Sequence, residues 1–415
     1  MRIKKLTIII LFSAMCINVK NINARTNYDF RGSISKDVLL NYLSRAITMN
    51  GLSYSACPED DYRMIENIGA KFVGRVSYIW NSKTDYPAHY GKAVSEEDIF
   101  AKAEETARRL HEIDSDIIAQ ACIFEIVEKQ HVNSVDIPER VFQEYGLEAV
   151  KRKFNYDDML YAGGKRQDFW GPSQSVPDMS RLETRMWFFY RATRYIDLGY
   201  EAIHFGQCHL MDAADDGHKN WWDTITRIRK YAAENARRGL VLCDSHTHGI
   251  VDKDGNLMYD FHSYPSRPID IAGKPYHARL EFGTHNSIYG KSKGGIAPSG
   301  WKCDSLPYIV EFDNTHTSGR EGRPDLGSPW VWGYEEITWF TFRNTDFRNN
   351  WLEYAFNWIK ENDPVGNLEM PGKVPTAFYH PGGRRLWYMA NTPGEGCPGG
   401  YGQEQKIKDL WTKEQ

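Results

Sequence analysis

Short apolar runs alternate with amphipathic segments along most of the chain. The apolar runs predict strands at 45–50, 70–79, 116–127, 201–207, 239–245, 278–284, 307–313 and a last one within 376–391. Segments with polar start signals predict helices at 62–68, 99–113, 184–198, 219–237 and 346–361. This alternation predicts an α/β protein whose fold is a (β/α)8 TIM-like barrel.

The alternation weakens between the fifth and seventh predicted strands. Stretches rich in Gly and Pro at 249–277 and 285–306 occupy places where a regular barrel would have helices. We therefore expect a barrel that is irregular on the side of strands 5–7, with an open doubly wound sheet as the alternative. No linker, repeat or low-complexity run divides the chain, so residues 25–415 are predicted to form a single (β/α)8-barrel catalytic domain.

The first 24 residues have the pattern of a signal peptide. Basic residues at the start precede an apolar stretch from Leu6 to Cys16 and a polar segment that ends at Ala24. The apolar stretch is far shorter than the roughly 20 residues that span a bilayer. We expect an exported protein, periplasmic or extracellular. A lipid anchor at Cys16 is less expected, because Met15 stands where a small residue is needed.

Charge and cysteine content narrow the choice of partners. The formal net charge is −4, and removal of residues 1–24 would take away four positive charges and make it −8. A mildly acidic chain argues against nucleic acid or an anionic membrane as a partner. The six cysteines outside the signal peptide form no C-x-x-C pair, which favours buried thiols over a disulfide framework.

Polar side chains gather where several predicted strands end. They are Glu125, His204, Gln207, His209, Asp244, His246, His248, Glu281, Glu311 and Asp313. Side chains alternate between the two faces of a strand, so Glu311 and Asp313 share one face while Val310 and Phe312 share the other. In a barrel the apolar pair packs against the outer helices and the two carboxylates point to the mouth.

Converging carboxylates are what hydrolysis of an acetal requires. One carboxyl gives a proton to the leaving oxygen, and a second attacks the anomeric carbon or activates water. The candidate catalytic residues are Glu125, Asp244, Glu281, Glu311 and Asp313. Among these we assign Asp313 as nucleophile or base and Glu125 or Glu281 as acid. For each one taken singly, the alternative is a salt bridge to an arginine such as Arg75 or Arg279.

Aromatic residues suit the same kind of ligand. The chain contains 13 Trp and 24 Tyr, and several Trp fall in predicted loops. Flat aromatic faces stack on sugar rings, so we expect Trp80, Trp332 and Trp339 to contact a substrate, with core packing as the alternative. His204, Gln207, His209 and His246 are predicted to hydrogen-bond the same substrate.

Together these features resemble the (β/α)8 glycoside hydrolases that bacteria export to degrade polysaccharides. The resemblance covers residues 45–391 at the level of architecture, without a named family motif. It implies a carbohydrate substrate, paired carboxylates and no cofactor. The chain departs from many retaining barrel families after the fourth strand, where Gln207-Cys208-His209 stands in place of the acid/base carboxylate. Asp212 or an acid from another strand would have to serve, or the chemistry differs.

A second hypothesis rests on Asp244-Ser245-His246-Thr247-His248. This segment is similar to the H-x-H strand end of the amidohydrolase superfamily, in which two imidazoles bind a metal that activates water. In that superfamily the motif closes the first strand, whereas here it follows the fifth. The alternatives to a glycosidase are therefore a metal-dependent hydrolase that uses Asp244, His246 and His248, and a glycan-binding barrel without catalysis.

Overall fold

The computed structural model describes residues 26–77, 80, 95–283, 292–313, 318–324, 328–381, 383 and 385–413. In this part of the chain the main sheet has the strand order β16-β15-β1-β2-β3-β6-β7. Its strands are β1 (Ala46–Met49), β2 (Phe72–Ser77), β3 (Ile118–Cys122), β6 (Ala202–His204), β7 (Leu242–Asp244), β15 (Met370–Tyr379) and β16 (Arg385–Met389). All neighbours are parallel except β16, which pairs with β15 in the antiparallel sense.

A second, smaller sheet has the order β14-β13-β8 and is parallel throughout. Its strands are β8 (His262–Pro265), β13 (Tyr308–Glu311) and β14 (Gly366–Leu368). At one end it continues directly into the main sheet, because only Glu369 separates β14 from β15 and its N–H donates to the Val310 carbonyl (2.9 Å). At the other end the Asp260 and Ser263 N–H groups donate to the carbonyls of Cys243 (2.9 Å) and Ser245 (3.4 Å), beside β7.

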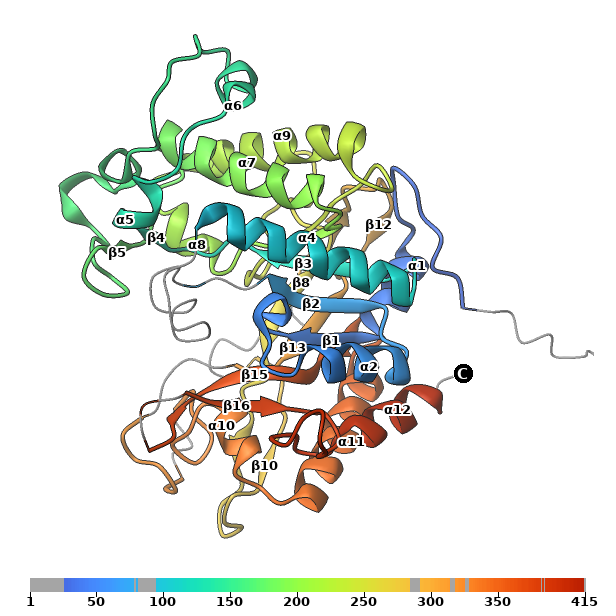
Figure 1. The fold of residues 1–415 in the computed structure, drawn as a ribbon. Coiled ribbons are helices and arrows are strands. Elements are labelled where there is room, and N and C mark those ends of the chain that lie inside the picture. The colour runs from blue at the N-terminus through green and yellow to red at the C-terminus, as the bar shows by residue number, and fades with distance from the viewer. Residues whose placement is uncertain are drawn as a thin grey trace, which may run out of the picture.

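Most helices cover the outer side of these strands, whereas α1 (Lys36–Leu43) packs on the inner face. The other longer ones are α2 (Pro58–Ile68), α4 (Glu96–Ile113), α7 (Leu182–Asp197), α9 (Lys219–Asn235), α11 (Thr345–Asn362) and α12 (Glu404–Thr412). Figure 1 shows α4, α7 and α9 above the strands and α2, α11 and α12 below them. Local signals explain several starts: Ser95 forms a capping box with Asp98, and the Asn344 side chain accepts from the Phe347 N–H.

Shorter elements occupy the loops. They are the helices α5 (Lys129–Val132), α6 (Glu139–Glu144), α8 (Cys208–Met211) and α10 (Glu336–Thr341), and the strands β4 (Val127–Glu128), β5 (Gln174–Ser175), β9 (Ile269–Asp270), β10 (Ala278–Arg279), β11 (Gly295–Ile296) and β12 (Lys302–Cys303). The β9–β10 and β11–β12 pairs are antiparallel and lie outside both parallel sheets.

The strands bury both of their faces, and the two faces pack against different partners. One face joins the large outer core with the helices, and it carries Val73, Ala119, Ile203, Val310 and Phe312. The prediction that Val310 and Phe312 face the outer helices is therefore confirmed.

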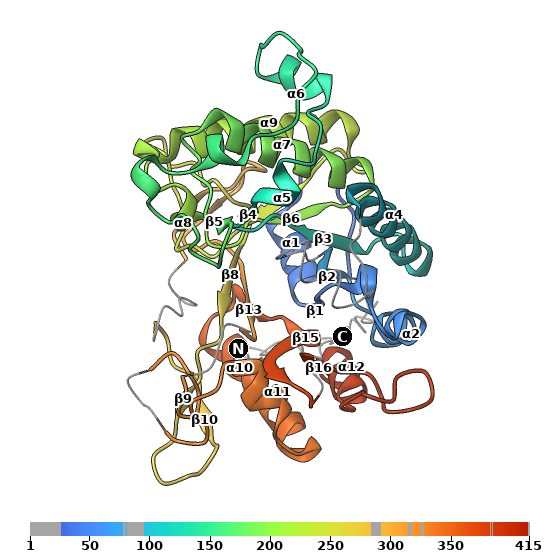
Figure 2. The same ribbon diagram turned by 60° about the vertical axis from the view of Figure 1, so that its left-hand side comes forward.

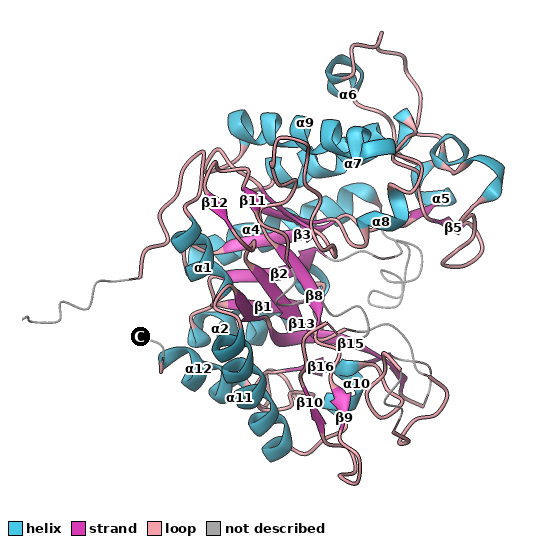
Figure 3. Ribbon diagram, turned by 180° about the vertical axis from the view of Figure 1, so that it is seen from behind, coloured by secondary structure: helices cyan, strands magenta, loops and turns pink. Residues whose placement is uncertain are grey.

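The other face forms a separate apolar cluster to which both sheets contribute. Its strand members are Ala46, Phe72, Ile118, Ala202, Leu242 and Ile309, and Phe261 joins them just before β8. Helix α1 closes this cluster with Val38, Leu39, Tyr42 and Leu43. Figure 2 shows β8 and β13 on the other side of the centre from β1, β2 and β3, and Figure 3 shows the same strands from behind. The two sheets thus enclose one packed interior.

Six predicted strand segments contain observed parallel strands. The last one, 376–391, contains the antiparallel β16 and only the end of β15, whose parallel pairing with β1 lies at 370–373. The strand predicted over 278–284 is wrong as a member of the parallel sheet, because β10 pairs only with β9 and the Arg279 side chain is half-exposed. Its place is taken by β8, within the predicted loop 249–277. Because His262 and Ser263 are polar, this strand contains no apolar run that would predict it.

The predicted signal peptide, with Cys16, lies outside the described residues. Within the described residues, no helix has the length and apolar character needed to cross a bilayer. The helices predicted at 62–68, 99–113, 184–198, 219–237 and 346–361 are all observed, with ends that differ by a few residues.

We predict that the inner apolar cluster is essential for stability. Phe72 is fully buried there, with its ring 5.5 Å from that of Phe261. Phe72→Ala should lower the free energy of unfolding by about 3–5 kcal/mol, since it leaves a cavity that the rigid strands cannot fill. Urea denaturation followed by circular dichroism measures the change. Leu147→Ala, at an exposed position, is the control; equal effects of both variants would contradict this packing.

Candidate functional site

A layer of polar positions lies on the inner face, directly beyond the apolar cluster in the direction of the strand ends. Seven of its eight positions follow a residue of the apolar cluster by two, as side-chain alternation along a strand requires, and Glu369 lies between β14 and β15. The layer consists of Thr48, Gly74, Gln120, His204, Asp244, Ser263, Glu311 and Glu369, all of them buried. Parallel strands thus bring together polar groups that are far apart in the sequence.

Asp244 is enclosed by three of its neighbours in this layer. Its Oδ1 accepts from Gln120 Nε2 (2.8 Å), its Oδ2 is paired with His204 Nδ1 (2.7 Å), and the Ser263 hydroxyl donates to Oδ2. Burial lowers the pKa of His204, although Asp244 opposes this effect. A neutral imidazole donates through Nδ1 to Asp244 and leaves Nε2 as an acceptor. Asp244 therefore orients other groups and is closed to a ligand.

Glu311 forms the charged centre of the layer. It accepts from Arg75 Nη2, and its Oε1 lies 2.7 Å from His246 Nε2. Burial alone would raise the pKa of Glu311, but the Arg75 guanidinium and His246 lower it to about 2. Glu311 is thus held as a carboxylate at neutral pH, and the half-buried His246 ring lies between it and the solvent side.

Arg75 reaches this centre because of a backbone irregularity. By alternation from Phe72 its side chain would point outward, yet Arg75 has φ 56° and the β2–β3 register shifts between Val73 and Ser77. The Arg75 N–H donates to Gln120 Oε1 (3.1 Å), which holds the irregularity in place. A non-glycine residue in the left-handed region costs of order 1–3 kcal/mol, and such strain persists where surrounding contacts enforce it.

Glu369 lies beside Glu311 and differs from it in protonation. Burial, followed by the charge of Glu311, raises the pKa of Glu369 to about 8. Its tip rests against Gly74, where an added Cβ would lie 2.0 Å from Glu369 Oε1. Only a glycine at position 74 leaves room for this carboxyl. The layer therefore holds one ionised and one protonated glutamate next to each other at neutral pH.

Glu125 follows β3 and is held by the turn after β6. Its oxygens accept from the Gln207 N–H (2.9 Å) and from Gln207 Nε2 (3.0 Å). Gly206 permits this approach, since it has φ 58° and an added Cβ would lie 1.8 Å from Glu125 Oε2. The carbonyl of Gly206 accepts from the His246 N–H (2.9 Å). One turn thus fixes Glu125 and also the histidine that contacts Glu311.

An aromatic cluster adjoins Glu125. We call it the aromatic rim; it consists of Trp80, Phe124, Phe169 and Trp170. Trp170 Nε1 donates to the Glu125 carbonyl (3.0 Å), and its ring lies 4.8 Å from that of Trp80 and 4.7 Å from that of Phe169. Phe169 is 51% exposed. Trp80 thus lies beside the tryptophan that is bonded to Glu125, and its contact with a substrate stays a prediction.

Two further predicted residues lie at the edge of this arrangement. Asp313 is paired with Arg267 (2.7 Å), which also binds the buried Glu336 (3.0 Å). His209, in α8, has its pKa lowered by burial, while the charges of Asp212 and Glu125 oppose this change. His209 is thus within electrostatic range of Glu125, and the Asp313 charge is already balanced by an arginine.

Three predicted site residues are placed elsewhere. Glu281 follows β10, is 47% exposed and pairs with Arg279, because the segment forms a hairpin and not a barrel strand. Trp332 and Trp339 are buried, and their indole N–H groups donate to the carbonyls of His277 and Tyr276. A buried indole in the core, 4.9 Å from the ring of Trp351 in the case of Trp339, cannot stack on a sugar.

The hypothesis of a metal site on Asp244, His246 and His248 finds no matching geometry. Both Asp244 oxygens are used by protein donors, His246 Nε2 faces Glu311, and His248 is exposed. No group of three or more His, Cys, Asp or Glu among the described residues is arranged to hold a metal ion.

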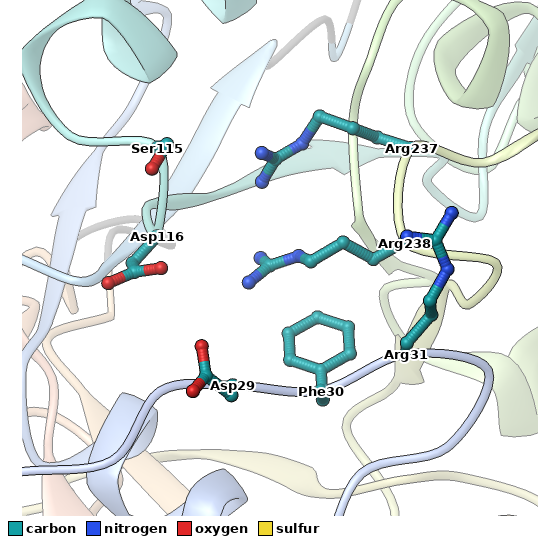
Figure 4. Close-up of a pocket in the computed structure, with 7 residues that line it drawn as sticks. All are labelled: Asp29, Phe30, Arg31, Ser115, Asp116, Arg237 and Arg238. Atoms are coloured by element: carbon teal, nitrogen blue, oxygen red, sulfur yellow. The ribbon is translucent and has the colours of Figure 1, made fainter.

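A separate cavity of about 420 Å³ lies at the opposite ends of the strands. It is lined by Asp29, Phe30, Arg31, Ser115, Asp116, Arg237 and Arg238, with the two neighbouring guanidinium groups pointing into it (Figure 4). Arg237 and Arg238 both donate to the fully buried Glu201, and Arg238 lies 3.8 Å above the Phe30 ring. These charges are used within the protein, so we place the candidate site at the polar layer.

Comparison with known proteins gives only distant likenesses. No known family and no curated protein matches the sequence. Structural neighbours are glycoside hydrolases. A candidate α-N-acetylgalactosaminidase from Bacillus halodurans is 10% identical, with a TM-score of 0.30 over 48% of each chain. An α-galactosidase from Thermus thermophilus is 14% identical, with a TM-score of 0.31 over 59% of this chain and 42% of that one.

The third neighbour is the glycoside hydrolase domain of PelA from Pseudomonas aeruginosa. It is 9% identical, with a TM-score of 0.25 over 62% of this chain and 81% of that domain. The matches span about half the length of the first two neighbours. At these scores the likeness carries no argument about activity, and the function is argued from the site itself.

We predict a pH dependence of stability that comes from Glu369. Between about pH 4.5, where a free glutamate titrates, and about pH 8, the folded protein keeps a proton that the unfolded chain releases. Stability is therefore full below this window and falls as the pH rises through it. Glu369→Gln should flatten the fall, as measured by urea unfolding at several pH values. Glu281→Gln, at a half-exposed position, should leave the profile of the wild type unchanged; a parallel profile in Glu369→Gln would contradict the assignment.

Proposed function

We propose that the two parallel sheets form one closed ring, a (β/α)8-type barrel that is irregular between β7 and β8. Three observations support this. The strands alternate with covering helices, β14 runs into β15, and backbone hydrogen bonds join the segments beside β7 and β8. The apolar cluster to which both sheets contribute has the place of a barrel interior. The polar layer would then lie at the carboxyl-terminal mouth, where barrel enzymes carry their active sites.

We propose that the protein is a glycoside hydrolase that acts through Glu311 and Glu125. One observation carries this proposal. The buried, ionised Glu311 contacts His246, and the turn at residues 206–207 binds both the His246 N–H and the carboxyl group of the buried Glu125. Hydrolysis of an acetal needs one carboxylate that stays ionised and one carboxyl that can give up a proton. Arg75 and His246 supply the environment for the first role at Glu311.

Glu125 suits the role of proton donor better than the other candidate carboxyl groups. It is held by the amide donors of Gln207 and not by an arginine, so a change in its protonation breaks no ion pair. Asp313 is neutralised by Arg267, Asp244 is enclosed, and Glu281 is remote. In the proposed mechanism Glu125 protonates the leaving oxygen, while Glu311 attacks the anomeric carbon or removes a proton from water.

The substrate we propose is a poly- or oligosaccharide. The aromatic rim offers ring faces for stacking beside Glu125, and Gln207, His209 and His246 offer hydrogen bonds from the same side. The partly exposed arrangement of Phe169 and Trp170 allows more than one sugar ring to bind. The sequence pattern of residues 1–24 further supports export, which fits an enzyme that acts on polysaccharides outside the cell.

We predict that Glu311→Gln and Glu125→Gln each lower kcat on an active glycoside by about 10²–10⁴-fold, because each removes one of the two acid–base groups. A panel of aryl glycosides and polysaccharides supplies the substrate for wild-type protein, and circular dichroism checks the fold of each variant. Glu281→Gln is the matched control and should retain wild-type turnover. Full activity of both site variants, or binding of a glycan without turnover in the wild type, would overturn the proposal.

A second prediction concerns the aromatic rim. Trp170→Phe keeps an aromatic face but loses the hydrogen bond to Glu125, whereas Trp170→Ala removes the face as well. We expect Trp170→Ala to raise KM for an oligosaccharide about tenfold or more, since stacking on an aromatic ring is worth of order 1 kcal/mol or above. The control is Trp339→Phe in the core, which should lower the midpoint of thermal unfolding with little change in KM. A KM unaffected by Trp170→Ala would exclude the rim from substrate binding.

A further inference from the structure

Two cysteines far apart in the chain meet at the outer edge of the fold. Cys57 is the N-cap residue of α2, and Cys397 lies in the segment between β16 and α12. The two thiols lie within electrostatic range of each other, and Cys397 Sγ lies 3.8 Å from Met389 Sδ. Gly396, next to Cys397, lies against the first turn of α2, since an added Cβ on it would be 3.2 Å from Asp60 Oδ1. Cys397 is buried, whereas Cys57 is partly exposed. A reagent in solvent can therefore reach Cys57 first.

The surrounding contacts hold the two segments against each other. Asn391 Nδ2 donates to Asp60 Oδ2 (2.8 Å), in the first turn of α2. Glu404, at the start of α12, accepts two hydrogen bonds from Arg63 (2.7 and 2.8 Å) and one from Asn67 (2.6 Å). The backbone is thus fixed on both sides of the cysteine pair, and these contacts hold α2 and the segment of Cys397 side by side.

The local electrostatics suit thiol exchange at Cys57. The amino terminus of an α-helix favours an anion, and α2 begins directly after Cys57. The Lys373 ammonium is fully buried, forms no hydrogen bond in the described structure and interacts electrostatically with Asp61, Cys57 and Cys397. The Lys373 ammonium also lies 5.3 Å from the centre of the Trp387 ring. Burial, followed by Cys57 and the carboxylates of Asp61 and Asp60, raises the pKa of Cys397, so Cys397 is the thiol that reacts second.

We propose that Cys57 and Cys397 are a redox-active pair that closes to a disulfide linking α2 to the carboxyl-terminal segment. The oxidant is a disulfide, either a small one such as oxidised glutathione or that of a thiol–disulfide oxidoreductase. The Cys57 thiolate attacks the oxidant, forms a mixed disulfide and releases one thiol. Cys397 loses its proton and attacks the Cys57 sulfur, which releases the second thiol. Two electrons and two protons pass from the protein to the oxidant.

Closure of this bond would tie together two ends of the fold that are otherwise joined by hydrogen bonds and packing. The closed loop spans most of the chain, so the bond restricts the unfolded ensemble strongly. We expect the oxidised protein to unfold at a temperature several degrees higher than the reduced protein. The inference does not depend on the proposed glycosidase activity, which uses groups at the strand ends.

The test equilibrates the full-length protein with oxidised and reduced glutathione and identifies the products by mass spectrometry of the intact protein and of its peptides. The expected result is loss of two hydrogens, a peptide pair that joins Cys57 to Cys397, and a raised thermal midpoint that dithiothreitol reverses. Cys397→Ser should stop the reaction at a Cys57–glutathione adduct and abolish the reversible shift.

Cys303→Ser is the matched control, because Cys303 is also partly exposed but its thiol donates to the Gly295 carbonyl (3.8 Å), away from this pair. It should form the disulfide as the wild type does. The proposal is overturned if the wild type keeps both thiols free in oxidised glutathione, or if it accumulates only the Cys57 adduct while it remains folded.

Discussion

The buried ion pair between Arg75 and Glu311 is the interaction on which the rest of the site depends. Two charges taken out of water cost several kcal/mol each unless their geometry is good and their remaining polar atoms are bonded. Here Glu311 is bound by Arg75 and also contacts His246, while the Arg75 backbone is fixed by Gln120. The same charge on Glu311 helps to keep Glu369 protonated. The ion pair thus keeps Glu311 ionised, and the Glu311 charge adds to the burial that raises the pKa of Glu369.

The inner side chains explain how this pair is held in place. Apolar residues fill one level of the interior and helix α1 closes it, so the polar layer above rests on a rigid base. Asp244 links three strands of that layer through Gln120, His204 and Ser263. Of the groups that we propose for chemistry, Glu311 belongs to this layer, and Glu125 is joined to it through His246 and the turn after β6. The apolar cluster therefore supplies stability, and the polar layer on the same strands supplies the groups proposed for chemistry.

Much of this arrangement was predictable from the alternation of side chains. The faces assigned to Val310, Glu311 and Phe312 agree with the structure, and so do six of the strand segments and all five of the predicted helices. Glu369 could have been found in the same way, since a lone acid between Leu368 and Met370 indicates a buried carboxyl. The β8 strand could not be predicted in this way, because its buried residues His262 and Ser263 are polar and form no apolar run.

Other features depend on tertiary structure that local patterns do not encode. The Arg75 side chain turns inward because of a register shift between β2 and β3, and no pattern in the neighbouring residues predicts this shift. Trp332 and Trp339 look like loop residues in the sequence, but Trp339 lies in α10 and packs on Trp351, and Trp332 packs on Tyr276. Glu281 was misplaced because a half-exposed hairpin has the same short alternation as a barrel strand.

The most direct test of the account is a titration of the glutamate carboxyls by carbon-13 NMR, with Glu311→Gln and Glu369→Gln for assignment. It needs no knowledge of the substrate. The account predicts that Glu311 stays ionised down to about pH 2, or until acid unfolds the protein, and that Glu369 keeps its proton until about pH 8. Titration of both carboxyls between about pH 4 and 5, as in free glutamate, would contradict it.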